Sequence, residues 1–240
     1  MVYQEKIGFT LNPVKNFLID CVDFLFPNLC HLCDRKLTRS RFVICEDCIS
    51  KLTKADQTDL DNFYSEHFTA SDIVINFYSK YLFTREGNFQ RLVHSLKYNG
   101  ISKIGIQIGN EIGKDLSKLD WFEKVDFLIP VPLHYIKKIE RGYNQSFMIC
   151  RGINEFTQKP IDTKILKRVR NTKTQTLLSK EERQRNMEGA FVIINHSEIK
   201  NKNIAIVDDV CTTGSTSQEC LKILFENGAA SVSIITSAIA

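Results

Sequence analysis

The spacing of apolar and polar positions changes repeatedly along the chain, and the changes predict alternating strands and helices. Short runs that are apolar, or alternating and rich in aromatic residues, predict strands, whereas apolar residues at every third or fourth position predict helices. Short, nearly all-apolar strands between helices indicate a parallel sheet covered on both faces, which is an α/β fold. The expected strands are 73–83, 125–131, 190–194, 204–207 and 232–239, and the expected helices are 12–26, 89–98, 104–116, 143–156 and 216–226.

Two segments depart from this alternation. Residues 51–66 are polar and acidic and predict a partly helical connector, so we expect a domain boundary near residue 55. The chain would then comprise a lead-in helix with a cysteine-containing module at 1–55 and an α/β domain at 56–240. Residues 162–188 are basic and polar with little periodicity, and a loop of that length is usually a functional lid or a disordered segment.

The composition favours a globular, cytoplasmic protein. The chain has 240 residues, of which 43% are hydrophobic, enough for a buried core. The apolar stretch 17–32 is interrupted by Asp20, Asp23 and Pro27, so we expect neither membrane insertion nor a signal peptide there. The net charge of +4 is uneven, because 134–185 contains 13 basic and 5 acidic residues. Such a run is most often a solvated surface, but it also suits a segment that faces an anion.

Four of the eight cysteines form two CxxC pairs, Cys30 with Cys33 and Cys45 with Cys48. In a reducing compartment two such pairs favour a metal site over disulfides. Four thiolates are the ligand set of a tetrahedral structural Zn²⁺, which would have no open position for substrate and would fold the module rather than catalyse. His31 is an alternative ligand, and unmetallated thiols or a redox pair are the alternatives to zinc.

The most informative segment is 204–216, in which an apolar strand runs into two acids and a hydroxyl-rich turn that opens a helix. Open α/β sheets place ligands at the carboxyl ends of their strands, and a helix N-terminus offers free backbone N–H groups to an anion. Asp208 and Asp209 would repel a phosphate but suit the hydroxyls of a ribose. We therefore predict a ribose 5-phosphate site that consists of Asp208, Asp209, Val210, Cys211, Thr212, Thr213, Gly214, Ser215 and Thr216.

A second strand-to-helix connection, IPVPLH at 129–134 followed by RGYNQ at 141–145, is also basic. Arg141 and the N-terminus of the following helix could hold an anion, and Gly142 would allow close backbone approach. The alternative is an ordinary basic turn that Asn144 caps.

These motifs carry a resemblance to known families. The segment 204–216 resembles the phosphoribosyl pyrophosphate (PRPP) loop of type I phosphoribosyltransferases, although Cys211 stands where that loop often has a different residue. The cysteine pairs, LKYNG at 96–100, PVPLH, RGYNQ and this loop together are similar to the ComF family, whose members are associated with natural competence and DNA uptake. The resemblance implies a type I phosphoribosyltransferase-like parallel sheet with flanking helices and a small N-terminal four-cysteine zinc module.

The resemblance also implies roles for individual residues. Asp208, Asp209 and Arg141 would act in catalysis, with Arg141 as the cation for pyrophosphate, and PRPP would bind together with Mg²⁺. The basic segment at about 162–188 would be a hood over the site.

Three functions remain open at this point. The first is transfer of a 5-phosphoribosyl group from PRPP to an acceptor, with release of pyrophosphate. The second is handling of single-stranded DNA without catalysis, and the third is PRPP-dependent regulation without turnover. No residue identifies the acceptor or an oligomeric state.

Overall fold

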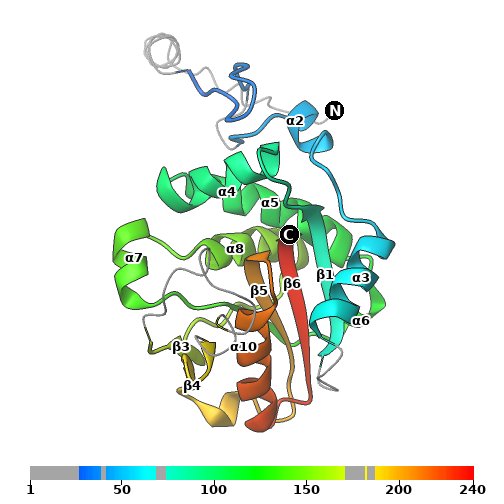
Figure 1. Ribbon diagram of the computed structural model, residues 1–240, viewed down its shortest axis with the longest axis vertical. Helices are drawn as coiled ribbons and strands as arrows, with labels where there is room; N and C mark the ends of the chain where they lie inside the picture. Colours follow the sequence, from blue (N-terminus) through cyan, green and yellow to red (C-terminus); the bar gives the residue numbers. More distant parts are fainter. Residues whose placement is uncertain (1–26, 39–41, 69–73, 171–181, 183–186) are drawn as a thin grey trace, which may run out of the picture.

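The computed structural model describes residues 27–38, 42–68, 74–170, 182 and 187–240. The lead-in helix predicted at 12–26 lies outside them. The main sheet has the strand order β1-β6-β5-β2, and each neighbouring pair is parallel (Figure 1). This sheet confirms the predicted α/β class. Its strands are β1 (Val74–Leu82), β2 (Phe127–Pro130), β5 (Asn203–Cys211) and β6 (Ser231–Ile239).

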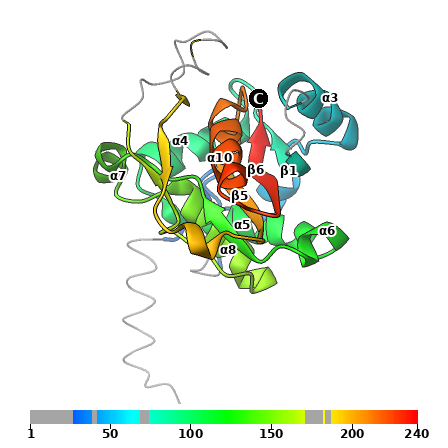
Figure 2. The ribbon, with the colours of Figure 1, turned by 90° about the horizontal axis from the view of Figure 1, so that it is seen from below.

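Each face of the sheet has its own hydrophobic core, because alternate residues of a strand point to opposite faces. In β5, Ala205 and Val207 pack on one side and Ile204 and Ile206 on the other. The first core includes helices α4 (Asn88–Tyr98), α5 (Ser102–Leu116) and α8 (Gln145–Thr157), and the second includes α3 (Gln57–His67) and α10 (Ser215–Glu226) (Figure 2). Both central strands are therefore covered on both sides, as the near-continuous apolar runs predicted.

Helices α5 and α8 lie unusually close together. A side-chain carbon at Gly109 would lie only 2.1 Å from the Ile149 carbonyl oxygen, and one at Gly152 only 2.0 Å from that of Ile106. Because only glycine permits this approach, these two positions bring the two backbones into direct contact. The result is a rigid helical layer behind the carboxyl ends of β2 and β5.

The smaller elements correct several sequence-based expectations. The predicted strand 190–194 is β4 (Phe191–Ile193), which pairs antiparallel with β3 (Leu166–Arg168) in a separate two-stranded sheet instead of joining the main sheet. Strand β3 belongs to the segment predicted as a hood, and residues 171–181 and 183–186 of that segment lie outside the described residues. A helix, α7 (Tyr135–Arg141), occupies the connection that we expected to be a turn. Among the described residues, the other short elements are α2 (Glu46–Ser50), α6 (Asp120–Glu123) and the 3₁₀ helix η2 (His196–Glu198).

The predicted strand 204–207 extends to Cys211, because β5 keeps its pairing with β6 through Asp208 opposite Thr236 and Cys211 opposite Ile239. The two acids therefore belong to the strand rather than to the turn that follows. Within the described residues, no helix combines the length and the hydropathy that crossing a bilayer requires.

The cysteine-containing segment packs on the helical layer through one buried glutamine of α5. The Gln107 side-chain oxygen accepts hydrogen bonds from the backbone N–H groups of Val43 and Ile44, each at 3.0 Å, and its amide donates to the Ile44 carbonyl at 2.6 Å. Further along, Thr53 and Ala55 hydrogen-bond to the end of β1. The domain boundary near residue 55 stays a prediction.

Candidate functional site

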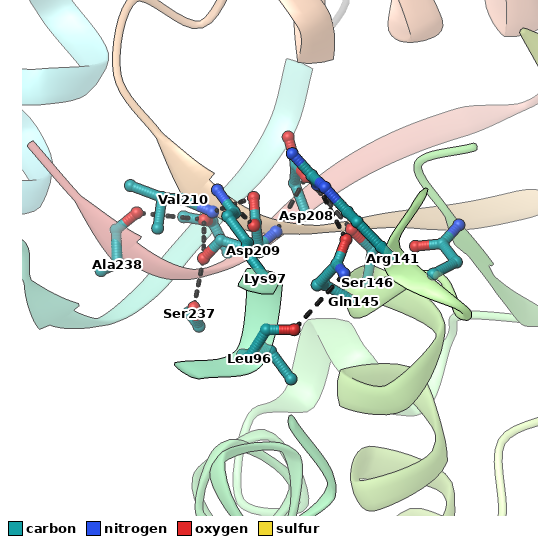
Figure 3. A network of polar contacts seen from close by, with 12 residues as sticks. Leu96, Lys97, Arg141, Gln145, Ser146, Asp208, Asp209, Val210, Ser237 and Ala238 are labelled. Carbon is teal, nitrogen blue, oxygen red and sulfur yellow. Dashed lines mark hydrogen bonds and ion pairs between the residues drawn. The ribbon is translucent and has the colours of Figure 1, made fainter. Parts of the chain in front are cut away.

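Two carboxylates lie side by side at the carboxyl end of β5, each with a partner from a different helix. Ser146 of α8 donates a hydrogen bond to Asp208 at 3.2 Å, and the Lys97 ammonium of α4 lies 2.6 Å from Asp209 (Figure 3). Both side chains of the ion pair are largely withdrawn from solvent, with 23% of Lys97 and 13% of Asp209 exposed. Two separate helices therefore fix the positions of the acids.

The two acids differ in their proton affinity. Burial and the adjacent Asp209 carboxylate raise the pKa of Asp208 to about 7. Burial would raise the pKa of Asp209 as well, but the charge and hydrogen bond of Lys97 outweigh it and lower that pKa below its ordinary value. At neutral pH Asp209 is therefore ionised, whereas the carboxyl of Asp208 titrates near neutrality.

The turn after β5 forms a small hollow, lined by Asp208 and by residues 210–217. Gly214, at φ +69°, is the N-cap of α10, so the first N–H groups of the helix face the hollow without intrahelical partners. The Ser217 hydroxyl also lines the hollow and is buried beside the Cys211 thiol. Burial raises the pKa of Cys211 to about 12, so its thiol adds no charge. The hollow is suited to an anion.

Cations from three elements surround the acids. Arg141 of α7 helps to lower the pKa of Asp209, and Asp208 in turn acts on the pKa of Arg168 in β3. Burial together with Arg168 and Arg141 lowers the pKa of Lys137, a neighbour in the same cluster. With Lys97 these residues form a cation cluster (Lys97, Lys137, Arg141 and Arg168), which agrees with the excess of basic residues in the sequence.

The connection through RGYNQ differs in detail from the expectation. Gly142 is the C-cap of α7 at φ +76°, and nothing lies near its missing side chain, so glycine is needed for this conformation rather than for close approach. Asn144 caps α8 by accepting a hydrogen bond from the Phe147 N–H at 3.3 Å. This hydrogen bond confirms that Asn144 caps the helix, as the alternative interpretation predicted. Arg141 nevertheless belongs to the cation cluster.

The four cysteines of the two CxxC pairs come together as predicted. The sulfur atoms of Cys30, Cys33, Cys45 and Cys48 all lie within 4.8 Å of one another. The Cys33 and Cys45 sulfurs are 3.7 Å apart, close to the separation of about 3.8 Å that a tetrahedron with Zn–S bonds of about 2.3 Å gives. Burial acts to raise the pKa of Cys30, but backbone N–H groups that point at its sulfur lower it to about 7, which favours a thiolate. The cluster could hold a zinc ion, and His31 is exposed and outside it.

Sequence reasoning brought together Asp208, Asp209, Arg141 and the turn up to Thr216, but it missed other residues of the site. The hydroxyl of Ser217 is one residue beyond the predicted motif. Lys97 lies in LKYNG, which we used only as a family pattern, and that motif was the one signal that could have revealed it. Arg168 lies in the basic segment 162–188 that we predicted as a hood, but nothing in the local sequence marks Ser146, which the tertiary fold alone brings to Asp208.

The fold and site define an α/β protein with a hydroxyl-rich loop, suited to an anion, at the end of a central strand and with a four-cysteine cluster. No protein-family model matches the chain. The DNA utilization protein YhgH of Shigella flexneri is 30% identical over 229 residues, which cover 87% of this chain and 95% of that protein. Competence protein F of Haemophilus influenzae is 33% identical over 122 residues, 50% of this chain and 53% of that protein, so that match spans about half of each chain. Competence protein ComFC of Bacillus subtilis is 26% identical over 233 residues, 95% of this chain and 86% of that protein.

The chain therefore belongs to the ComF family of competence and DNA utilization proteins. Among solved structures, a hypoxanthine phosphoribosyltransferase from Staphylococcus aureus matches with a TM-score of 0.35 and 20% identity, covering 55% of this chain and 61% of that chain. A glutamine PRPP amidotransferase from Bacillus subtilis matches with a TM-score of 0.37 and 20% identity, over 55% of this chain and 26% of that chain. At these scores the likeness is limited, and the fold class rests on the strand order and pairing.

Proposed function

We propose that the chain binds PRPP with Mg²⁺ and transfers its 5-phosphoribosyl group to an acceptor, releasing pyrophosphate. The observation that carries the proposal is that three kinds of group meet at one edge of the sheet. The carboxylates of Asp208 and Asp209, the hollow at the start of α10 and the cation cluster suit, respectively, a sugar diol, a monoester phosphate and a diphosphate.

In this proposal each part of the site contacts one part of the ligand. Asp208 and Asp209 accept hydrogen bonds from the ribose hydroxyls, and the turn from Thr212 to Ser217 holds the 5-phosphate. Arg141 neutralises charge on the pyrophosphate as the bond to C1 of the ribose breaks. The sugar becomes cation-like as that bond breaks, and the protein acts mainly by position and by electrostatic stabilisation of the leaving group.

Mg²⁺ would be held mainly by phosphate oxygens and water, as is usual for this ion, so the site needs no dedicated cage of protein ligands. Its chemistry would be to neutralise the diphosphate. The four cysteines would hold a structural Zn²⁺, which in the reducing cytoplasm stabilises the module that packs on Gln107.

A second candidate function, handling of single-stranded DNA, is favoured by one feature of the surface. Tyr98 and Tyr135 have 64% and 65% of their surface exposed, and the Arg141 guanidinium lies 5.8 Å from the centre of the Tyr98 ring. An exposed aromatic ring beside a cation, as at Tyr98, suits stacking of unpaired bases. The names of the relatives, competence and DNA utilization proteins, agree with such a partner.

Calorimetric titration with PRPP and Mg²⁺, followed by a pyrophosphate-release assay over candidate acceptors, tests the first proposal. Saturable binding that Asp208→Ala with Asp209→Ala abolishes supports the site, and acceptor-dependent pyrophosphate release supports the transferase. Binding without release under every acceptor would favour a PRPP-dependent regulator. Absence of PRPP binding, with steeply salt-dependent binding of an oligonucleotide that Tyr98→Ala weakens, would favour the DNA-handling function.

A further inference from the structure

The LKYNG and RGYNQ motifs, 45 residues apart in the sequence, contact each other at the site. The Leu96 carbonyl is in the last turn of α4, where carbonyl groups lack intrahelical partners. It accepts a hydrogen bond from the Tyr143 hydroxyl at 2.5 Å and another from the Gln145 side-chain amide at 3.4 Å. The peptide group that leads into Lys97 is thereby tied to the second motif.

The other end of the same glutamine holds Arg141. Its side-chain oxygen accepts a hydrogen bond from the Arg141 guanidinium at 2.9 Å, and only 1% of Gln145 is exposed (Figure 3). The Gln145 amide is shared with the Tyr143 carbonyl, also at 3.4 Å. One buried side chain therefore joins the two turns that carry the two cations, Lys97 and Arg141.

The chemistry of these partners fixes the orientation of the glutamine amide. A guanidinium can only donate hydrogen bonds, so Arg141 must face the side-chain oxygen of Gln145. Carbonyl oxygens can only accept, so Leu96 and Tyr143 must face its nitrogen. Side chains of similar size cannot replace the amide. A glutamate carboxylate would repel the two carbonyl oxygens, and a methionine thioether would leave the guanidinium without its acceptor.

We propose that Gln145 is a positioning residue that places Lys97 and Arg141 on either side of the acid pair, so that the site accepts a diphosphate beside its two carboxylates. This inference rests on the proposed function and deepens it. A diphosphate near Asp208 and Asp209 would otherwise meet strong repulsion. Lys97, paired with Asp209 at 2.6 Å, lies where it can offset the charge of the acids and of the diphosphate. The hydrogen bond to Gln145 holds the Arg141 guanidinium in place to bind the diphosphate.

The test compares two ligands and two glutamines. Ribose 5-phosphate probes the acids and the phosphate hollow, whereas PRPP with Mg²⁺ also requires the cations. Gln145→Met should weaken PRPP binding by about tenfold or more, from the lost charged hydrogen bond, and weaken ribose 5-phosphate by less than about threefold. Gln107→Met, at another buried glutamine, in the contact with the cysteine module, should lower stability to urea and leave both affinities unchanged.

A double variant separates positioning from general damage. Because Gln145 acts partly through Arg141, the loss of PRPP affinity in Gln145→Met with Arg141→Met should be at least about threefold smaller than the product of the two single losses. Gln145→Glu, which keeps the volume and the acceptor, should still weaken PRPP because its carboxylate faces the Leu96 carbonyl. Fully additive losses, or equal losses for both ligands in Gln145→Met, would overturn the proposal.

Failure of the two proposals can be told apart. If the wild type binds neither PRPP nor ribose 5-phosphate, the proposed function fails. The positioning role is then decided by a crystal structure of Gln145→Met, in which we expect the Arg141 guanidinium and the turn at Lys97 to be displaced. Unchanged positions of Lys97 against Asp209 and of Arg141 in that structure would overturn the inference.

Discussion

Replacement of Asp208 by Asn should make the protein more stable and at the same time a poorer binder. The amide has nearly the same shape as the carboxylate, and its oxygen can still accept hydrogen bonds from Ser146 and from the backbone N–H of Asp209, now 3.2 Å and 2.8 Å away. The substitution removes only the negative charge of Asp208. Burial and the Asp209 carboxylate make that charge unfavourable in the folded protein, which is why they raise the pKa of Asp208 to about 7.

The size of the effect depends on pH in a definite direction. In the unfolded chain the Asp208 carboxyl titrates near its ordinary value of 3.8, so between that value and about 7 the folded state binds more protons than the unfolded state. Stability therefore falls as pH rises through this window, and the penalty is absent below it and complete above it. Between pH 5 and pH 8 the wild type should lose about 2–3 kcal/mol that Asp208→Asn does not lose, at about 1.4 kcal/mol per pH unit of the window.

Urea denaturation of both proteins at pH 5, 6.5 and 8 measures this difference. The advantage of Asp208→Asn should grow steadily with pH. At pH 8, where Asp208 of the wild type is ionised, the affinity of Asp208→Asn for ribose 5-phosphate should be about tenfold or more lower, because hydrogen bonds to a charged acceptor are lost. Equal pH dependence of stability in the two proteins would refute the raised pKa. A variant that is both less stable and unable to bind would instead mean that Asp208 is a structural residue.

Two further predictions concern the other parts of the chain. Cys30→Ser with Cys45→Ser should release one zinc ion per chain, measured by elemental analysis, and lower the melting temperature, whereas Cys150→Ser, at a buried cysteine outside the cluster, should keep the metal. Gly214→Ala should cost about 1–2 kcal/mol of stability by chemical denaturation and weaken phosphate binding, since φ is +69° and the added carbon would lie 2.9 Å from the Phe68 ring; an unchanged protein would contradict this geometry.

The sequence was sufficient to bring together residues that lie close along the chain. The residues from Asp208 to Thr216 and the two members of each cysteine pair are only a few residues apart, so a strand end, a helix start or a tight turn places them side by side. The fold class followed similarly, because a strand with apolar residues on both faces, such as β5, needs helices on both sides.

The parts that could not be predicted depend on packing between distant elements. Lys97 reaches Asp209 only because α4 ends beside β5, and Ser146 reaches Asp208 only because α8 packs on β5. The end of β5 was missed for a related reason. Two acids suggest the end of a strand, but here pairing with β6 continues through them, and Lys97 offsets the charge.

The contact between LKYNG and RGYNQ also explains why the acids can lie inside the strand. An aspartate pair this close is tolerable only if one charge is neutralised or protonated. The structure uses both means, since Lys97 holds Asp209 ionised and Asp208 takes up a proton near neutral pH. Lys97 can stay paired with Asp209 only if the end of α4 keeps its position. Tyr143 and Gln145 hold that end by donating hydrogen bonds to the Leu96 carbonyl. The same side chains that permit a destabilising acid pair thus prepare the site for an anion.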